Sequence, residues 1–437
     1  MQPTKPATTS LENHWMPFTA NYDFIQAPRL VVKGEGMYLW NESGKQLLDC
    51  SSGLFCVALG HCREEITEAV SRQLSTLDFI SPFQLGQPKS FELASKLADL
   101  LPGDIGHVFF SNSGSESIDT AMKLIIAYHQ ANGEARRTKF ISRERSYHGM
   151  NIGGTSLAGI VRNRRTFEAI TLNVCHMRHT LTGEERFVNG QPQNGAELAD
   201  DLLRAVDTYG GENIAACFVE PIAGSTGMLI PPMGYLERLR DICNQHGILL
   251  VFDEVITGFG RTGKMFASEA FGVTPDIITM AKALTNGALP MGATAVSKTI
   301  YNRLVKEPKG KGVEFAHGYT YSGHPVACAA ALATLDIFQK ENIVEHAAEL
   351  SPYFLERVFS LRDLPGVVDI RGYGMAAAVD FETQGAPGAY GMAAAEKLYN
   401  AGLHVRFSGD CAMLTPSLIC ETAHVDQIVE TIRSVLG

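Results

Sequence analysis

The chain has 437 residues, of which 45% are hydrophobic and 19% are charged. At roughly 100–200 residues per domain, this length predicts two or three domains with sizeable cores, and no apolar run reaches the roughly 18 residues of a membrane-spanning helix. The formal net charge of −10 gives no overall basic field for nucleic acid, so we expect a small-molecule ligand.

Nine cysteines are spread from Cys50 to Cys420, and none forms a Cys-x-x-Cys pair. The odd count and the scatter argue against a zinc site and against a disulfide framework. The stretch Met1–Met16 has no apolar run after a basic head, so it does not resemble a secretory signal. These features predict a cytoplasmic protein with reduced thiols.

The first hundred residues change character at about His61. Before it, the β-prone runs Arg29–Val32 and Met37–Trp40 are separated by glycine and a turn cluster, which predicts a small antiparallel ribbon. After it, apolar residues at helical spacing predict helices around Ile66–Leu74 and Leu93–Leu101.

The middle third alternates short apolar runs with helical stretches such as Tyr235–His246. This pattern is typical of a parallel sheet covered by helices on both faces, which places the protein in the α/β class. The predicted strands are Val108–Ser111, Lys139–Ser142, Ala216–Val219, Leu249–Asp253 and Ile277–Ala281.

The last third predicts a smaller α+β domain. A helical region over Ala327–Leu361 leads into strands near Val367–Phe381 and His404–Phe407, and a last helix covers about Ala423–Val435. We expect the N-terminal ribbon to join this domain.

Ligands of open α/β sheets bind beyond the carboxyl ends of the strands, so residues directly after each strand are candidate site residues. The segment Ser111–Ser117 follows one strand and opens a helix, where free amides, hydroxyls and the small Gly114 could seat a phosphate monoester. Serine-rich segments also cap helices without any ligand, and both interpretations stay open from the residues alone.

Two charged residues end apolar strands. Asp253 could keep a cationic ring nitrogen protonated, or it could simply cap the next turn. Burial of Lys282 would lower its pKa and free its amine to attack a carbonyl, although most lysines reach solvent instead. An anion seat, Asp253 and Lys282 together match the phosphate, ring nitrogen and aldehyde of pyridoxal phosphate. Arg406, in a strand-like apolar frame, could bind a carboxylate in a bidentate manner or pair with a neighbouring acid.

The chain resembles the class III pyridoxal-phosphate aminotransferases, and among them the omega-amino acid:pyruvate (beta-alanine:pyruvate) group, over almost its whole length. These enzymes have an aspartate-aminotransferase-like fold (fold type I), with a large domain and a smaller α+β domain. The motifs that carry the resemblance are Asn13-His14-Trp15-Met16-Pro17-Phe18, Ser113-Gly114-Ser115-Glu116-Ser117, Ser146-Tyr147-His148-Gly149, Val219-Glu220-Pro221-Ile222, Val251-Phe252-Asp253-Glu254-Val255-Ile256-Thr257-Gly258-Phe259-Gly260-Arg261 and Gly318-Tyr319-Thr320-Tyr321-Ser322-Gly323-His324-Pro325.

The resemblance implies a role for each cofactor-binding residue. Lys282 would be the catalytic lysine that joins the aldehyde of pyridoxal 5'-phosphate, and Asp253 would hold the pyridine nitrogen. Gly114 and Ser115 would bind the phosphate.

Four further cofactor contacts follow from the same resemblance. Tyr147 would stack on one face of the ring and Val255 would press on the other. Glu220 would lie near the ring hydroxyl. Thr320 would reach the phosphate of the other subunit's cofactor, because the active sites of this family are shared across a dimer.

The resemblance also assigns the substrate side of the pocket. Arg406 would bind the keto-acid carboxylate, and Trp15 would lie near the substrate. Ser225 stands where relatives that use 2-oxoglutarate carry Glu, which favours pyruvate as the acceptor. Phe55 stands where the beta-alanine group usually has Trp, and Met413 where some members have Gln. These two departures alter the pocket and widen the expected donors to omega-amino acids or primary amines.

Ala283 replaces a common Gly directly after the lysine. The resemblance divides the chain into an N-terminal segment 1–60 that packs with the small domain, a large cofactor-binding domain 61–325 and a small domain 326–437. It implies a homodimer with shared active sites, and a homotetramer is also compatible with it. A covered interface would explain the low charged fraction.

The expected reaction transfers an amino group from the donor to pyruvate by a ping-pong mechanism, giving an aldehyde or ketone and L-alanine. Three alternatives remain open. The same scaffold could carry an aminomutase or a decarboxylating transaminase, or a transaminase for another donor such as 4-aminobutyrate or taurine. A non-catalytic binding module is disfavoured by the intact Lys282 and Asp253.

Overall fold

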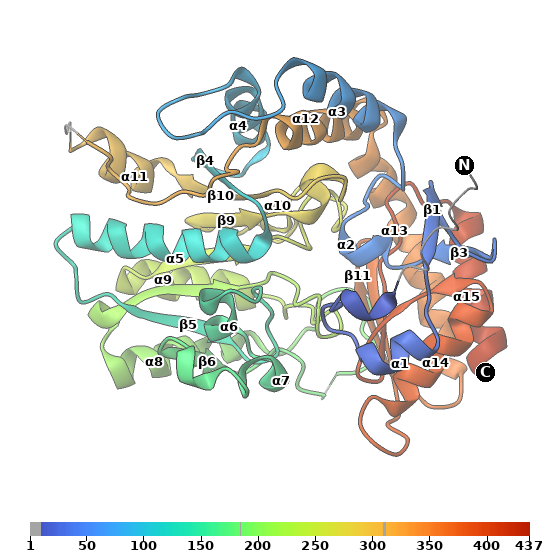
Figure 1. The fold of residues 1–437 in the computed structure, drawn as a ribbon. Helices are drawn as coiled ribbons and strands as arrows, with labels where there is room; N and C mark the ends of the chain where they lie inside the picture. Colours follow the sequence, from blue (N-terminus) through green and yellow to red (C-terminus); the bar gives the residue numbers. More distant parts are fainter. Residues whose placement is uncertain (1–9, 184, 309–311) are drawn as a thin grey trace.

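A computed structural model of the chain describes residues 10–183, 185–308 and 312–437. The first nine residues, where no secretory signal is expected, lie outside the described residues. The described chain forms a large body around one central sheet and a smaller body beside it (Figure 1). None of the helices in the described ranges is long and apolar enough to cross a membrane.

The central sheet has seven strands in the order β4-β10-β9-β8-β7-β5-β6. The strands from β9 to β6 in this order run parallel, and β10 lies antiparallel between β4 and β9. The predicted α/β class is confirmed, while β6 and β10 are additions to the predicted strands. The strands are β4 (Ile105–Ser111), β5 (Lys139–Arg143), β6 (Val174–Met177), β7 (Ile214–Val219), β8 (Leu249–Asp253), β9 (Ile277–Met280) and β10 (Gly292–Ser297).

The central strands are apolar on both faces because helices cover both. In β7, Ala216 and Phe218 belong to one buried cluster together with residues of α5 (Gly114–Ala131). Cys217 and Val219 belong to the cluster on the opposite face, which includes residues of α9 (Tyr235–His246). Continuous hydrophobic runs are what a strand buried on both faces requires, so the sequence pattern is explained by this layering.

Further helices surround the sheet. In Figure 1, α3 and α4 lie beside α12 along one end of the large body, and α6 and α8 flank β5 and β6. These helices are α3 (Glu64–Thr76), α4 (Pro88–Leu100), α6 (Ile152–Leu157), α7 (Val161–Arg164), α8 (Asp201–Tyr209), α10 (Ala267–Ala270), α11 (Lys298–Tyr301) and α12 (Pro325–Lys340). The N-terminal helices α1 (Asn21–Gln26) and α2 (Ser52–Phe55) lie toward the smaller body (Figure 1).

The smaller body combines the two ends of the chain. Its antiparallel sheet has the order β11-β12-β15-β14, and a second sheet has the order β1-β2-β3-β13. Because β13 pairs in parallel with β3, a C-terminal strand extends the predicted N-terminal ribbon. The elements are β1 (Val31–Glu35), β2 (Tyr38–Asn41), β3 (Gln46–Asp49), α13 (Ile343–Phe359), β11 (Val367–Tyr373), β12 (Ala376–Phe381), α14 (Ala389–Asn400), β13 (Leu403–His404), β14 (Arg406–Ser408), β15 (Cys411–Leu414) and α15 (Thr422–Leu436).

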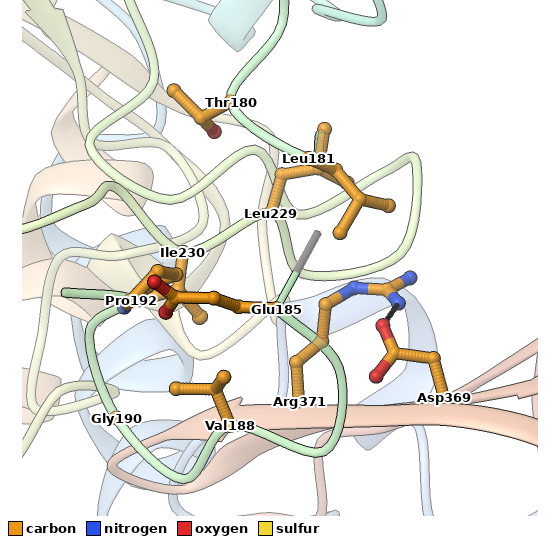
Figure 2. Close-up of a pocket in the computed structure, with 10 residues that line it drawn as sticks. All are labelled: Thr180, Leu181, Glu185, Val188, Gly190, Pro192, Leu229, Ile230, Asp369 and Arg371. Atoms are coloured by element: carbon orange, nitrogen blue, oxygen red, sulfur yellow. Dashed lines mark hydrogen bonds and ion pairs between the residues drawn. The ribbon is translucent and has the colours of Figure 1, made fainter. Parts of the chain in front are cut away.

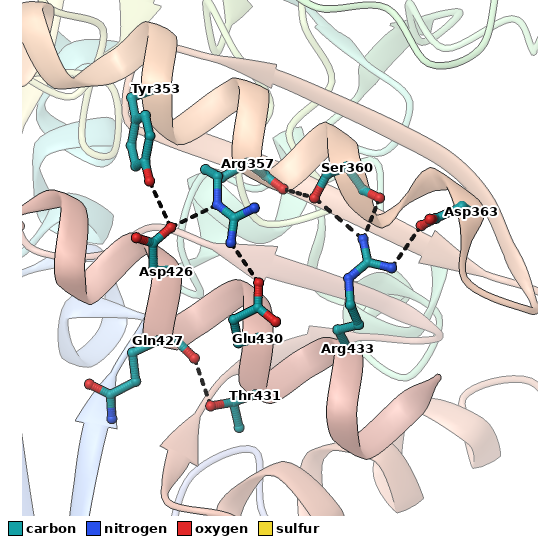
Figure 3. A network of polar contacts seen from close by, with 9 residues as sticks. All are labelled: Tyr353, Arg357, Ser360, Asp363, Asp426, Gln427, Glu430, Thr431 and Arg433. Carbon is teal, nitrogen blue, oxygen red and sulfur yellow. Dashed lines mark hydrogen bonds and ion pairs between the residues drawn. The ribbon is translucent and has the colours of Figure 1, made fainter.

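Ion pairs join α13 to α15 on the outside of the smaller body (Figure 3). Arg357 donates to Asp426 at 2.7 Å and to Glu430 at 2.6 Å, and Tyr353 donates to Asp426 at 2.7 Å. These groups are partly solvent-exposed, so we assign them a modest role in docking the last helix.

Candidate active site

One cavity gathers seven of the predicted site residues at the carboxyl edge of the central sheet. The space between its lining residues is about 560 Å³, including the part that is open to solvent. The residues that line it are Gly114, Ser115, Tyr147, His148, Gly149, Glu220, Asp253, Val255, Ile256, Ala281 and Lys282.

The sheet topology explains this convergence. Glu220 directly follows β7, Asp253 ends β8, and Lys282 comes two residues after β9. Parallel strands deliver their carboxyl ends to the same edge, so residues far apart in sequence meet there.

The first turn of α5 forms one wall of the cavity. Ser113 caps the helix by accepting the Glu116 amide at 3.2 Å, while the amides of Gly114 and Ser115 come too early in the helix to have a partner within it. A Cβ on Gly114 would lie 3.2 Å from both γ-carbons of Val255, so a larger residue here would press on Val255. This wall can bind an anion.

Asp253 is held by two hydrogen bonds and has a buried partner that the sequence analysis did not assign. One carboxylate oxygen accepts the Val255 amide at 3.2 Å, and the other lies 2.8 Å from Nδ1 of His148. His148 is 1% exposed, and its Nε2 has no partner within the described residues. His148 follows Tyr147 in the Ser-Tyr-His-Gly motif. No local pattern in the sequence indicates that it pairs with Asp253.

Glu220 braces the wall on the β7 side. Its carboxylate accepts the amides of Tyr147 at 2.9 Å and of Gly224 at 3.2 Å. Burial raises the pKa of Glu220, with Asp253 adding to the effect and the charge of His148 opposing it. Burial also raises the pKa of the Tyr147 phenol, which keeps that ring neutral at the cavity.

Lys282 lies at the junction of these walls. Its backbone is left-handed, with φ of 50°, a conformation that non-glycine residues adopt mainly at constrained sites. Burial lowers the pKa of Lys282, and the nearby acids oppose that effect without cancelling it. The Phe55 ring lies 5.5 Å from Nζ. An amine in this setting can be neutral and nucleophilic.

Arg406 stands on β14, next to Met413 of β15. Its Nε is buried without a partner, and its side chain forms no ion pair within the described ranges, so the alternative of a structural salt bridge is not seen there. Burial lowers the pKa of Arg406, and the charge of Arg162 lowers it further. A half-buried guanidinium without an acidic partner suits an incoming carboxylate.

Five of the predicted site residues do not line the cavity, namely Trp15, Phe55, Ser225, Thr320 and Arg406. Trp15 is 90% exposed, Thr320 is also exposed, and Ser225 is half-buried. Phe55 lies beside Lys282 without appearing in the cavity wall. The single chain therefore brings together the predicted cofactor residues except Thr320.

A second cavity of about 310 Å³ lies between residues 180–181, residues 185–192 and β11 (Figure 2). Its charged groups are already engaged, because Asp369 pairs with Arg371 at 2.8 Å and Glu185 accepts the amides of Gln193 and Asn194. It lacks the free amine and the helix terminus of the first cavity, which is therefore the candidate active site.

Comparison with known proteins decides the family. The family model described as aminotransferase class-III matches residues 20–436. The chain belongs to the class-III aminotransferases. It is 48% identical over 434 residues to the omega-amino acid–pyruvate aminotransferase of Pseudomonas putida, covering 98% of this chain and 96% of that protein. It is 46% identical to the beta-alanine–pyruvate aminotransferase of Pseudomonas aeruginosa, covering 100% and 98%.

Solved structures agree with this assignment. The omega transaminase of Pseudomonas jessenii, solved in complex with PMP, superposes with a TM-score of 0.93 at 33% identity, covering 98% of each chain. The protein is thus an aminotransferase with the fold of the omega-transaminases, as the sequence resemblance implied.

Proposed function

We propose that this aminotransferase moves the amino group of an omega-amino acid or related primary amine to pyruvate, giving an aldehyde or ketone and L-alanine. The observation that carries the proposal is the cavity in which Lys282, Asp253 and the start of α5 face one another. The names of the relatives at 46–48% identity, which specify omega-amino acids, beta-alanine and pyruvate, support the substrate class.

The cavity residues fit pyridoxal 5'-phosphate. The free amides of Gly114 and Ser115 would hold its phosphate, Asp253 its ring nitrogen and Lys282 its aldehyde, and the PMP complex of the related transaminase supports this choice. Tyr147 and Val255 would enclose the ring. When bound, this cofactor supplies an electron-accepting ring that stabilises negative charge on the carbon next to the nitrogen.

The protein's own groups would then move the proton. Nζ of Lys282, whose pKa burial lowers, would accept a proton from the amine-bearing carbon of the donor and return a proton to the cofactor carbon on the other side of the nitrogen. The hydrogen bonds of Asp253 to Val255 and His148 fix the direction of its carboxylate. Glu220 holds the backbone of Tyr147 and so keeps the aromatic wall in place.

Arg406 would distinguish the acceptor from a neutral donor. Its unpaired guanidinium would bind the carboxylate of pyruvate, and Ser225 offers no second carboxylate to pair with it. This arrangement favours pyruvate over 2-oxoglutarate. Beta-alanine would use the same arginine through its own carboxylate.

We further infer a cytoplasmic homodimer with shared active sites, with a homotetramer as a larger form. The exposure of Thr320 and of the apolar residues Phe83 and Phe91 supports a covered surface near the cavity. All nine cysteines are unpaired, which suits a reducing compartment.

A panel of substrates tests the proposed function. Beta-alanine, 1-phenylethylamine, 4-aminobutyrate and taurine are each offered with pyruvate, 2-oxoglutarate or glyoxylate, and the amino acid formed from each acceptor (alanine, glutamate or glycine) is measured. We expect alanine from pyruvate to form faster than glutamate or glycine from the other two acceptors, and initial rates that give parallel double-reciprocal lines. Product formed without any acceptor, or release of carbon dioxide, would instead favour an aminomutase or a decarboxylating transaminase.

A further inference from the structure

The segment 51–60, which contains α2 and leads from β3 to α3, has an unusual backbone beside Lys282. Ser52, Gly53 and Phe55 have φ of 40°, 65° and 61°. Two of these three residues are not glycine, and such conformations persist only where surrounding contacts hold them. The contacts that hold this segment therefore also hold Phe55 beside the reactive amine.

Asp49, the last residue of β3, supplies those contacts. It is 1% exposed. One of its oxygens accepts the Ser51 amide at 3.0 Å, and the other accepts the Gly53 amide at 2.6 Å and lies 2.9 Å from Nε2 of His61. Burial raises the pKa of Asp49, but the bond with His61, the charge of His404 and the two amides together lower it below its ordinary value. Asp49 is thus a buried carboxylate, and both of its oxygens are engaged in hydrogen bonds with this segment and with His61.

The same short segment also holds Arg406. The Arg406 amide donates to Oγ of Ser51 at 2.9 Å, and the Cys50 amide donates to the His404 carbonyl at 3.0 Å. Asp49 therefore fixes Ser51 by accepting its amide. The Ser51 hydroxyl in turn fixes the backbone of Arg406. Phe55 and Arg406 are connected to one carboxylate although they are about 350 residues apart in the chain.

We propose that Asp49 is a positioning residue that fixes the positions of Phe55 and Arg406 relative to each other at the substrate pocket. It thereby sets the preference between substrates with a carboxylate and substrates without one. It does not line the cavity, so it acts through the segment it anchors. The inference rests on the proposed function, because it takes Arg406 as the carboxylate-binding residue. Bidentate capture of a carboxylate needs accurate placement of the guanidinium, whereas a neutral amine does not use Arg406.

The test compares Asp49→Asn with Asp276→Asn in the full-length holoenzyme. Asp276 is a matched control, because it accepts the Leu250 amide at 2.7 Å and pairs with Arg240 at 2.8 Å at the opposite edge of the central sheet. For Asp49→Asn we expect the Michaelis constant for pyruvate and the inhibition constant for propionate to rise roughly tenfold. The Michaelis constant for the carboxylate-free donor 1-phenylethylamine should rise less than that for pyruvate, because this amine does not use Arg406 and is affected only by a shift of Phe55.

The cofactor absorption of Asp49→Asn should stay as in the wild type, since Asp49 stands outside the cavity wall. Equal effects on pyruvate and the neutral amine, or the same pattern in Asp276→Asn, would overturn the inference.

Ser51→Ala keeps the test decisive if Asp49→Asn does not fold. This change removes the acceptor of the Arg406 amide and leaves the Ser51 amide on Asp49. We expect a selective rise in the Michaelis constant for pyruvate. The Asp49→Asn/Ser51→Ala double variant should have a Michaelis constant for pyruvate no higher than that of Asp49→Asn alone, because both changes act through the same chain of hydrogen bonds. An unchanged Michaelis constant for pyruvate in Ser51→Ala overturns the inference.

Arg406→Ala distinguishes a failure of the carboxylate role of Arg406 from a failure of the positioning role of Asp49. If its Michaelis constant for pyruvate is unchanged, the carboxylate role of Arg406 fails and this inference falls with it. If Arg406→Ala weakens pyruvate while Asp49→Asn and Ser51→Ala do not, only the positioning role of Asp49 is wrong.

Discussion

At the scale of single residues, the protonation of Lys282 is the property on which the proposed chemistry depends. Burial disfavours the charged amine, so the pKa of Lys282 lies below the ordinary value of 10.5. Only the neutral amine attacks an aldehyde. The fraction of Lys282 ready to react should therefore reach its maximum at a lower pH than for a lysine in solvent.

The pH dependence of cofactor capture tests this property without measuring turnover. Apoenzyme is mixed with pyridoxal phosphate at a series of pH values, and the rate at which visible absorption appears is recorded. We expect the rate to rise with pH and to level off at a pH below the pKa of a free lysine, which is about 10.4. Lys282→Ala should acquire no such absorption, whereas Lys264→Ala, at an exposed ion pair with Glu269, should behave as the wild type. A rate that keeps rising through the ordinary lysine range would contradict the lowered pKa.

Arg406 allows a second prediction at this scale. Its side chain has no acidic partner within the described residues, so its removal leaves no orphaned carboxylate there. Hydrogen bonds to charged groups contribute about 1.5–3 kcal/mol, so Arg406→Ala should raise the Michaelis constant for pyruvate roughly 10–100-fold. The constant for the neutral donor 1-phenylethylamine should stay nearly unchanged, because this amine offers no carboxylate to the guanidinium.

Arg406→Lys, which keeps the charge without the planar fork, should fall between the wild type and Arg406→Ala. Steady-state kinetics with each substrate varied in turn would measure this. Parallel losses for both substrates would remove Arg406 from the carboxylate role.

At the scale of elements, the strands that the sequence predicts best are those buried on both faces. The hydrophobic pattern predicts Leu249–Asp253 with its observed bounds, because a fully apolar run between helices has few other structures open to it. β10, by contrast, has the sequence Gly-Ala-Thr-Ala-Val-Ser, whose small residues give no clear hydrophobic signal. Its place between β4 and β9 depends on tertiary packing that the local pattern does not encode.

The site residues also divide into those that a local pattern predicts and those that only the fold brings together. Asp253 and Lys282 can be found because charged residues at the ends of apolar strands are unusual, and the resemblance supplies Tyr147, Val255 and Glu220. The pairing of His148 with Asp253 cannot be found, because the two residues lie 105 positions apart and meet only through the order of the strands. Trp15 and Thr320 are exposed in the single chain, and the proposed dimer would decide where they lie relative to a site.

The junction of α5 with the Ser146–Gly149 motif gives a prediction at the scale of elements. Gly149 has φ of +95°, and a Cβ there would lie 2.3 Å from Oγ of Ser115 at the anion-binding turn. Gly149→Ala should therefore displace Ser115 and weaken the binding of pyridoxal phosphate to apoenzyme at least about tenfold. Gly133→Ala is the matched control, because Gly133 also has a positive φ of +78° but has open space around it.

Fluorescence titration of the apoenzymes with pyridoxal phosphate would measure both affinities. Both variants should lose some stability through the strained backbone, which thermal unfolding reports. Only Gly149→Ala should lose cofactor affinity. Equal affinities in the two variants would mean that the contact between Gly149 and Ser115 does not shape the phosphate seat.

At the scale of the whole molecule, the question is whether one chain can complete its own active site. Thr320 is exposed and stands outside the cavity of its own chain, yet it lies in one of the motifs that carry the resemblance to the family. Large apolar side chains lie open on the segments near it: Phe83 is 58% exposed, Phe91 67% and Tyr321 57%. These exposed apolar side chains support the proposed interface between two chains, in which two-fold symmetry would bring each Thr320 toward the other chain.

Mixing two defective variants decides which cavity Thr320 serves. Lys282→Ala and Thr320→Ala are purified separately, dissociated together and reassembled. In a mixed dimer, a Thr320 that serves the partner would join the intact Lys282 of the other chain, so one of the two sites would be complete. Random reassortment should then restore up to about a quarter of the wild-type activity. If Thr320 served its own chain, every site would carry a defect and mixing would restore nothing. Reassembly of the two variants at unequal ratios adds a control, because the recovered activity should follow the number of mixed dimers and vanish at either extreme.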